Sequence, residues 1–555
     1  MIKDNIIRHQ VARKAEVANI GKKIVEFNGQ EIGIFHVNGE YYAWRNICPH
    51  AGAPVCEGIV HGTNLPSNVY EYEFGLEGEI LRCPWHGWEF NLKSGEQLVD
   101  EHVKLKKVPI EADNTNIYIC KKERVREGTM NLKMSHYHIK SVKWGEDTQY
   151  NAGQLTINRQ YLLNYLKSKK EFSDIELTDI DLISPNTSTR VVNIFDVFAA
   201  RAKVGEHESD YPGVLGGMKP AGEGETAVLD DFTVLVLSSK QDKDNKILDM
   251  SGPAVEVTPY ANMCHLAIKA QPKNDDLPTG EYYGALKQLG LFAGCYLAYA
   301  ASKQVTNLAS VYHTGSLNEE LPKAVYICMI ASHQKSEPGE PILYGDDVSG
   351  LLPTILHPNE MLDGAVIAPY WNLGIDTYSF QNNPVVLNLY EKHGVEVNFS
   401  GVVVYVANIT REKRARSVTM IQNLVSSVLG ADIAIVSKLG GGIPESDLMM
   451  TIEALEEKEI DTSAVIWSSY NDGTIEDSLS ANSTAADALA SVGCYDIKLD
   501  IDPQNKVVGG DTVGPFSGDP NEDPLPAGSA LQVHYRTISG AISQLGASKV
   551  AMSEI

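Results

Sequence analysis

The chain has 555 residues, a length that exceeds one hydrophobic core and predicts about three folding units. Hydrophobic residues make up 43% and charged residues 21%, which is typical of a globular protein and excludes a collagen-like or disordered chain. The formal charge of -25 and the pI near 5.0 argue against nucleic acid and anionic membrane surfaces as partners, because both attract clusters of Lys and Arg.

The sequence predicts a cytoplasmic protein that does not span a membrane. Residues 1–20 mix acidic and basic side chains and leave no room for the apolar core of a secretory signal. The longest apolar stretch, Leu289 to Ala301, is shorter than the ~20 residues of a membrane-spanning helix and predicts a buried helix. Eight cysteines without a repeating pattern suit a reducing compartment.

Residues 5–121 contain short strand-like runs separated by turns, which predicts an all-β domain. Residues 61–78 are expected to be a long loop within it, and the charged residues 121–128 a linker behind it. The clearest strands, joined by Asn-Gly hairpin signals, are Lys22–Phe27, Glu31–His36 and Tyr41–Arg45.

Two short motifs in this domain combine thiol and imidazole groups. Cys48-Pro49-His50 and Cys83-Pro84-Trp85-His86 each provide one thiolate and one imidazole, and a glycine that permits a tight turn follows each of them. In a Rieske 2Fe-2S cluster two Cys bind one iron and two His bind the other. The motifs therefore predict such a cluster with Cys48, His50, Cys83 and His86 as ligands. The domain resembles the Rieske ferredoxins and the Rieske domains of ring oxygenases.

An oxygenase needs, in addition, a mononuclear iron held by two His and one carboxylate. The remaining histidines are scattered along the chain. His136 and His138 share one face of a predicted strand, but no carboxylate stands at helical spacing with a further His. The sequence therefore argues against an oxygenase.

From residue 131 onward strand-like and helix-like segments alternate, which predicts α/β domains with a mostly parallel, doubly wound sheet. We expect one α/β region over residues 131–390 and a second over residues 391–555. In the second region, predicted strands alternate with predicted helices in the order strand 401–407, helix 411–429, strand 431–437, helix 445–458 and strand 464–468.

Several segments between residues 131 and 510 resemble one enzyme family. They include RVVNIFDV at residues 190–197, LLPTILHPNEMLDGAV at residues 351–366 and LGGGIP at residues 439–444. These segments are similar to the substrate-binding subunit of component B in the glycine, sarcosine and betaine reductases. The resemblance implies that a small amine is bound here, and that a selenol or thiol on a partner subunit attacks its α-carbon in a reductive C–N cleavage.

The resemblance also singles out Cys264. In this family the proprotein can cleave itself before a cysteine, which leaves an N-terminal pyruvoyl group that captures amines as a Schiff base. Asn262 or His265 could assist the proton transfer. Self-cleavage predicts that Cys264 lies on an exposed or strained turn. The alternative is a buried cysteine beside a hydrogen-bonded histidine.

A polar turn provides the candidates for the substrate pocket, His357, Asn359, Glu360 and Asp363. Helix capping by Asn359 explains the same residues equally well. Gly440–Gly442 follow a predicted strand and could hold a phosphate at a helix N-terminus. Their spacing matches neither a P-loop nor a dinucleotide fingerprint, so a tight strand-to-helix turn is favoured.

Together these features predict an oxidoreductase, a redox subunit of a glycine/sarcosine/betaine reductase-like complex in which the Rieske 2Fe-2S cluster relays electrons. The sequence contains no selenocysteine. The resemblance therefore implies a selenol- or thiol-bearing partner subunit, and the cluster implies an electron donor protein. Two alternatives stay open: a D-proline reductase-like subunit that opens a ring, and a non-catalytic electron-transfer or scaffold subunit in which Cys264 is inert.

Overall fold

The structure is a computed structural model. It describes residues 2–27, 29–68, 71–113, 116–126, 130–205, 211–219, 221–240, 246–315, 317–333, 339–370, 374–468, 479–514, 523–546 and 549, with the backbone alone for residues 2–8 and 121–126. The chain forms two compact units, Met1–Thr129 and Met130–Ile555. Each unit has buried apolar clusters of its own.

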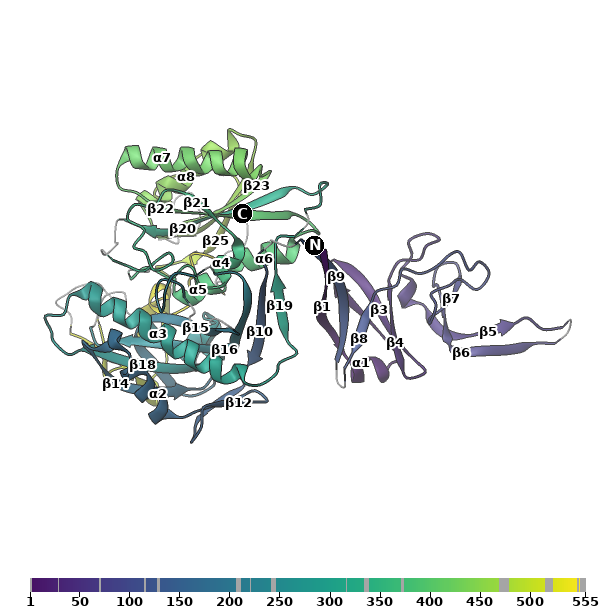
Figure 1. The fold of residues 1–555 in the computed structure, drawn as a ribbon, viewed down its shortest axis with the longest axis horizontal. Coiled ribbons are helices and arrows are strands. Elements are labelled where there is room, and N and C mark those ends of the chain that lie inside the picture. The colour runs from purple at the N-terminus through teal and green to yellow at the C-terminus, as the bar shows by residue number, and fades with distance from the viewer. Residues whose placement is uncertain are drawn as a thin grey trace. The chain divides into compact units, whose positions relative to one another are not determined.

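The N-terminal unit is built from short antiparallel strands in three sheets, with the orders β1-β9-β8, β2-β3-β4 and β5-β6-β7 (Figure 1). The predicted all-β domain is confirmed, and its described residues add a five-residue helix and a short 3-10 helix, Val55–Glu57. The elements are β1 (Ile2–Arg13), α1 (Lys14–Ala18), β2 (Lys22–Phe27), β3 (Gln30–Val37), β4 (Glu40–Arg45), β5 (Ile59–Leu65), β6 (Glu73–Arg82), β7 (Glu89–Asn91), β8 (Ile110–Ala112) and β9 (Asn116–Arg126).

The predicted loop at residues 61–78 is instead the greater part of a β-hairpin. β5 and β6 pair antiparallel from Ile59↔Arg82 to Leu65↔Glu73, and Figure 1 shows them extending as a ribbon from the rest of the unit. The loop prediction was wrong because backbone pairing, and not a buried apolar face, defines these strands. Tyr72 and Phe74 are 90% and 60% exposed.

The second unit contains an eight-stranded mixed sheet of order β14-β18-β16-β10-β19, in which β15 also pairs with β16, β17 and β27. The pairs β10·β16 and β16·β18 are parallel, whereas β15·β16 and β14·β18 are antiparallel. The strands are β10 (Leu132–His138), β14 (Ile175–Ile183), β15 (Thr189–Val204), β16 (Gly224–Ser238), β17 (Lys246–Asp249), β18 (Cys264–Pro272), β19 (Ala309–Tyr312) and β27 (Lys506–Val508).

A six-stranded sheet of order β21-β22-β20-β23-β24-β25 completes the layout, and all its pairs are parallel except β21·β22. The alternation of strands and helices predicted after residue 400 is present here. The doubly wound arrangement stays a prediction, because the larger sheet is mixed. The elements are β20 (Lys323–Ser332), β21 (Thr354–Leu356), α6 (Pro384–Lys392), β22 (Asn398–Ala407), α7 (Arg411–Asn423), β23 (Ile433–Ser437), α8 (Ile443–Glu456), β24 (Asp461–Ser468) and β25 (Leu489–Cys494).

The apolar stretch Leu289 to Ala301 belongs to helix α3 (Thr279–Ser302), which packs on β15 and β16. The predicted buried helix is confirmed, and among the described helices none is long and apolar enough to span a membrane. The remaining elements are β11 (Ser141–Trp144), β12 (Gln149–Asn151), β13 (Gln154–Ile157), α2 (Arg159–Lys167), α4 (Pro358–Leu362), α5 (Thr377–Gln381), β26 (Lys498–Ile501), β28 (Thr512–Val513), β29 (Leu525–Pro526) and β30 (Leu531–His534).

Candidate functional site

The two cysteine–histidine motifs form loops of the same geometry. In the first loop the N–H of Gly52 donates to the C=O of Cys48 (2.9 Å), and in the second the N–H of Gly87 donates to the C=O of Cys83 (3.1 Å). The two glycines have φ values of 72° and 70°, a conformation that a residue with a Cβ adopts at a cost. Two equivalent turns therefore hold the four candidate ligands.

The loops bring these ligands together as two pairs. Cys48 and Cys83 are each 2% exposed, and their thiols lie within hydrogen-bonding reach of each other. The Nδ1 atoms of His50 and His86 are 3.2 Å apart, and both imidazoles lie at the surface. The site thus combines a buried sulfur pair with an exposed imidazole pair.

Its electrostatics suit a bound metal. Burial raises the pKa of the Cys48 thiol, the backbone N–H groups of His50 and Ala51 lower it, and the adjacent Cys83 raises it. Those N–H groups point at the sulfur and would stabilise a thiolate. Among the described residues no group of three or more His, Cys, Asp or Glu surrounds a single ion. A Rieske cluster needs no such group, because each of its two irons takes two protein ligands, so the paired donors fit it.

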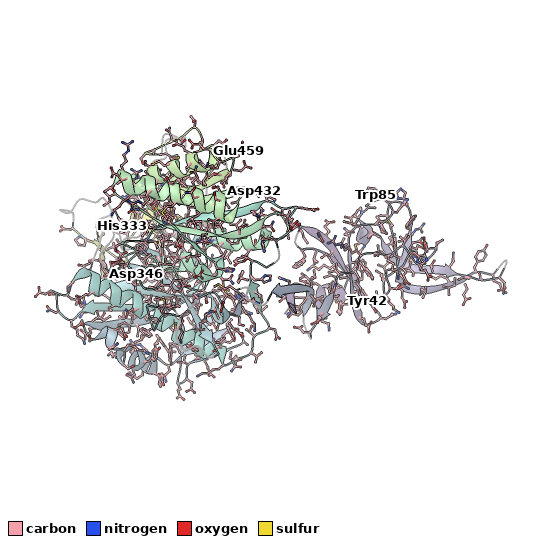
Figure 2. The ribbon with its side chains drawn as sticks, turned by 45° about the horizontal axis from the view of Figure 1, so that its top comes forward. Tyr42, Trp85, His333, Asp346, Asp432 and Glu459 are labelled. Atoms are coloured by element: carbon pink, nitrogen blue, oxygen red, sulfur yellow. The ribbon has the colours of Figure 1, made fainter. Side chains whose placement is uncertain are left out.

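Aromatic side chains cover one side of the histidine pair. Trp88 stacks on His50 with ring centroids 4.4 Å apart, whereas Trp85 is 61% exposed (Figure 2).

Cys56 is fully buried, and its N–H donates to Asn46 Oδ1 (2.6 Å). None of the described cysteines forms a disulfide, so no such bond links the two ligand loops.

In the second unit Cys264 is the first residue of β18 and follows a short turn at residues 260–262. Its side chain is 2% exposed, so the expected exposed position was wrong. The reason is parallel pairing with Phe232, which draws the start of β18 into the sheet. Burial, together with the charge of Asp231, raises the pKa of the Cys264 thiol to about 11.

His265, the neighbour of Cys264, is fully buried, and both its ring nitrogens are engaged. Its Nδ1 lies 2.7 Å from Thr233 Oγ1 and its Nε2 lies 2.9 Å from the C=O of Tyr260. A carbonyl oxygen only accepts, so Nε2 carries the proton and Nδ1 accepts from the hydroxyl. Burial lowers the pKa of His265 to about 4. The neutral imidazole is thereby fixed and is a poor proton carrier.

Sequence reasoning missed an acidic pair close to Cys264. Asp231 Oδ2 lies 3.4 Å from His138 Nδ1, and both oxygens of Asp230 lie 3.1 Å from His136 Nδ1. Asp231 has a φ of 59°, which a non-glycine residue seldom adopts. Two adjacent carboxylates within the mostly apolar run Ala227–Leu237 were the available signal.

The predicted substrate residues all lie on or beside helix α4. His357 caps the helix, where its Nδ1 accepts from the N–H of Asn359 (3.2 Å), while Glu360 Oε2 accepts from the N–H of His357 (2.6 Å). Tyr344 donates to the other oxygen of Glu360 (2.5 Å). The helix cap is therefore His357 and not Asn359.

The other two members of that group, Asn359 and Asp363, are buried. The Nδ2 group of Asn359 donates to the carbonyls of Gly222 (3.1 Å) and Tyr312 (2.9 Å). Asp363 accepts from Arg201 Nη2 (3.1 Å) and from Thr226, and it pairs with Lys203. These contacts tie α4 to β15 and β16 and leave both side chains fully engaged.

Replacing Asp363 with Ala is expected to lower the free energy of unfolding by about 3–5 kcal/mol, because Arg201 and Lys203 would keep buried charges without their partner. Urea unfolding of the full chain measures the change. Glu396→Ala, which removes an exposed ion pair with Lys392, is the control and should change stability little. Equal effects of the two substitutions would contradict the structural role of Asp363.

Side chains of the protein itself bind the backbone polar groups of the glycine turn before α8. The N–H of Gly440 donates to Gln544 Oε1 (2.7 Å), and Lys438 Nζ donates to the C=O of Gly440 (3.1 Å). Gly440 and Gly442 have φ values of 83° and 75°. These contacts agree with the favoured tight strand-to-helix turn.

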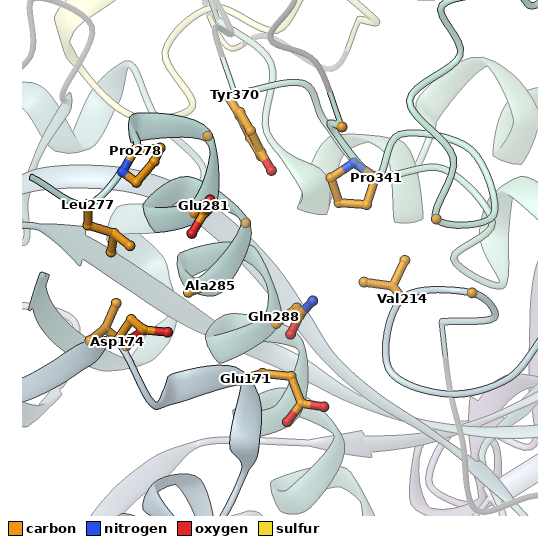
Figure 3. Close-up of a pocket in the computed structure, with 16 residues that line it drawn as sticks. Glu171, Asp174, Val214, Leu277, Pro278, Glu281, Ala285, Gln288, Pro341 and Tyr370 are labelled. Carbon is orange, nitrogen blue, oxygen red and sulfur yellow. The ribbon is translucent and has the colours of Figure 1, made fainter.

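A cleft of about 690 Å³ lies along the first turns of α3 (Figure 3). Glu171, Asp174 and Glu281 line it, and its described lining contains no Lys, Arg or His. None of the predicted substrate residues and neither Cys264 nor Asp231 is among the lining residues.

The paired loops of the N-terminal unit define an iron–sulfur protein of the Rieske type. The family model of the Rieske [2Fe-2S] domain matches residues 8–109. A ferredoxin component of the naphthalene 1,2-dioxygenase/salicylate 5-hydroxylase systems from Ralstonia sp is 29% identical over 96 residues, which are 17% of this chain and 77% of the relative.

The chain belongs to the family of glycine/sarcosine/betaine reductase component B subunits, whose model matches residues 130–553. Component B subunits alpha and beta of the glycine reductase complex from Acetoanaerobium sticklandii are 30% identical over 435 residues, 76% of this chain and 99% of the relative. The sarcosine reductase component B subunit alpha from Peptoclostridium acidaminophilum is 28% identical and covers 71% of this chain and 94% of its own length.

Proposed function

We propose that this chain is the substrate-binding redox subunit of an amine reductase complex. The observation that carries the proposal is the presence, in one chain, of a component B region at residues 130–553 and of an N-terminal unit with paired Cys and His side chains. The reaction is a reductive C–N cleavage, which consumes two electrons and releases an amine. Glycine, sarcosine and betaine, named in the relatives, define the substrate class.

In this proposal Cys48 and Cys83 hold one iron of a 2Fe-2S cluster, and His50 and His86 hold the other. When bound, the cluster supplies transfer of one electron at a time. The surface position of His50 and His86 supports their role as the side on which an electron donor protein docks. The thiols of Cys48 and Cys83 are buried, and the ring of Trp88 covers the imidazole of His50.

The amine is captured at Cys264 if the chain cleaves there and leaves a pyruvoyl group. The attacking selenol or thiol belongs to a partner subunit, because the chain contains no selenocysteine. In this proposal His357 and Glu360 lie near the substrate. Their capping contacts, and the buried contacts of Asn359 and Asp363, support a structural role equally.

Two other functions compete with this one. A D-proline reductase-like subunit would use the same chemistry to open a ring. The burial of Cys264 and the two hydrogen bonds of His265 favour a non-catalytic electron-transfer or scaffold subunit.

An anaerobic assay of the chain with its co-purifying partners tests the proposal. Glycine, sarcosine, betaine and D-proline are offered one at a time with a reductant. Release of ammonia, methylamine or trimethylamine is the expected result, and an opened proline ring supports the D-proline alternative. Oxidation of the reduced chain without consumption of any amine would leave only the electron-transfer role.

A further inference from the structure

A carboxylate lies where one edge of β16 changes its partner strand, directly before the pairing of Cys264. β15 pairs with both halves of β16, so β10 and β18 share the opposite edge of β16. β10 ends there with His138↔Asp230, and β18 begins with Phe232↔Cys264. Asp231 is the one residue of β16 between these two pairings, and it therefore lies between His138 and Cys264.

The backbone at this junction departs from a regular strand. The ladder between β15 and β16 shifts register between Ala199 and Arg201, opposite the stretch that contains Asp231, and Asp231 has a left-handed φ of 59°. Such irregularities turn a side chain out of the alternation of a strand, and they cluster at functional sites. Here the irregularity leaves the Asp231 carboxylate 60% exposed beside a buried thiol.

Other charged and titratable side chains interact with Asp231. Burial and, after it, the charge of Asp231 raise the pKa of Cys264. Burial and the charges of Asp230, Asp376 and Asp231 raise the pKa of Tyr378. His138 Nδ1 lies 3.4 Å from Asp231 and 3.6 Å from Asp230. Asp231 thus lies next to the Phe232↔Cys264 pairing, and His138 of β10 lies beside its carboxylate.

We infer that Asp231 is the proton acceptor for self-cleavage at Cys264 and that His138 positions its carboxylate. The inference rests on the proposed function, of which this cleavage is a part. The other candidates fit less well: His265 is buried with both nitrogens bonded, and both oxygens of Asp230 face His136. Asn262 carries an amide, which does not take up a proton.

The chemistry needs no external oxidant. Asp231 takes the thiol proton as the sulfur of Cys264 attacks the carbonyl carbon of Met263, the C–S bond forms, the C–N bond breaks and the amine takes up the proton. A base then removes the Cα proton of Cys264, and its Cβ–S bond breaks to leave a thiocarboxylate on Met263 and a dehydroalanine. Tautomerisation and water release ammonia and leave the pyruvoyl group.

The test follows the cleavage of freshly purified full-length chain by intact mass and denaturing electrophoresis. Asp231→Asn is expected to slow cleavage about 100-fold or more, the usual contribution of a positioned base. Asp231→Glu should restore most of the rate. Asp496→Asn, which removes the carboxylate of a comparable pair with His534, should cleave as the wild type does.

The pH profile separates a proton acceptor from a structural residue. With a proton acceptor inside the protein, the wild-type rate should change little between pH 7 and pH 9. In Asp231→Asn the thiol must lose its proton to solvent, and the rate should rise about tenfold per pH unit. If Asp231→Asn cleaves at the wild-type rate and this rate does not depend on pH, Asp231 is not the proton acceptor, but the pyruvoyl group stays in the mechanism. A wild type that stays uncleaved would remove both.

Discussion

Replacing His86 with Cys is expected to lower the reduction potential of the N-terminal unit by about 100–200 mV, because an anionic thiolate replaces a neutral imidazole on one iron. The reduced protein should also show a higher mean g-value, closer to that of all-thiolate clusters. His50→Ala should lose the signal, since one iron keeps a single protein ligand. A redox titration of the full chain followed by electron paramagnetic resonance measures both effects.

The control for this experiment is His36→Ala. His36 stacks on Tyr41 in the same unit and belongs to neither ligand loop. The substitution should leave the spectrum and the potential unchanged. Unaltered signals in both His86→Cys and His50→Ala would refute the Rieske assignment of these residues.

Cys264→Ala is expected to abolish processing of the chain. The wild type should show two fragments divided between Met263 and Cys264, and the variant one full-length band, because only the thiol can take over the upstream acyl group. A carbonyl reagent should label the C-terminal fragment of the wild type alone. Mass spectrometry of both proteins gives the new N-terminus.

Cys494→Ala serves as the matched control, because Cys494 is a buried cysteine of the same unit in strand β25. It should be processed like the wild type. A wild-type chain that stays whole and unlabelled, yet supports amine reduction with its partner, would remove the pyruvoyl group from the mechanism and leave the complex assignment intact.

The N-terminal unit could be read from its sequence because its signals are local. Asn38-Gly39 predicts a turn, and both residues have positive φ, 52° and 87°. Each ligand loop needs only a Cys, a His and a following Gly within a few residues. The hairpin at β5 and β6 could not be read in this way, since its exposed side chains give no apolar alternation.

The environment of Cys264 depended on contacts between distant segments. Residues 138, 231 and 264 come from three strands, and only the shared edge of β16 brings them together. The same holds for Asp363, whose partners Arg201 and Lys203 stand far away in sequence on β15. The substrate pocket suggested by the polar turn stays a prediction, whereas the buried contacts of Asp363 with β15 could not be predicted from the sequence.

The segment between the two ligand loops folds back on itself as the β5–β6 hairpin. The number of residues in this segment therefore does not determine how far apart the ligands lie. Its base, Ile59↔Arg82, pairs the residue before Cys83 with the strand that follows the first loop. Residues added or lost at the far end of the ribbon would leave that register unchanged. Changes in the length of this hairpin should therefore be tolerated. A shift of the Ile59↔Arg82 register by one residue, in contrast, would rotate Cys83 away from Cys48.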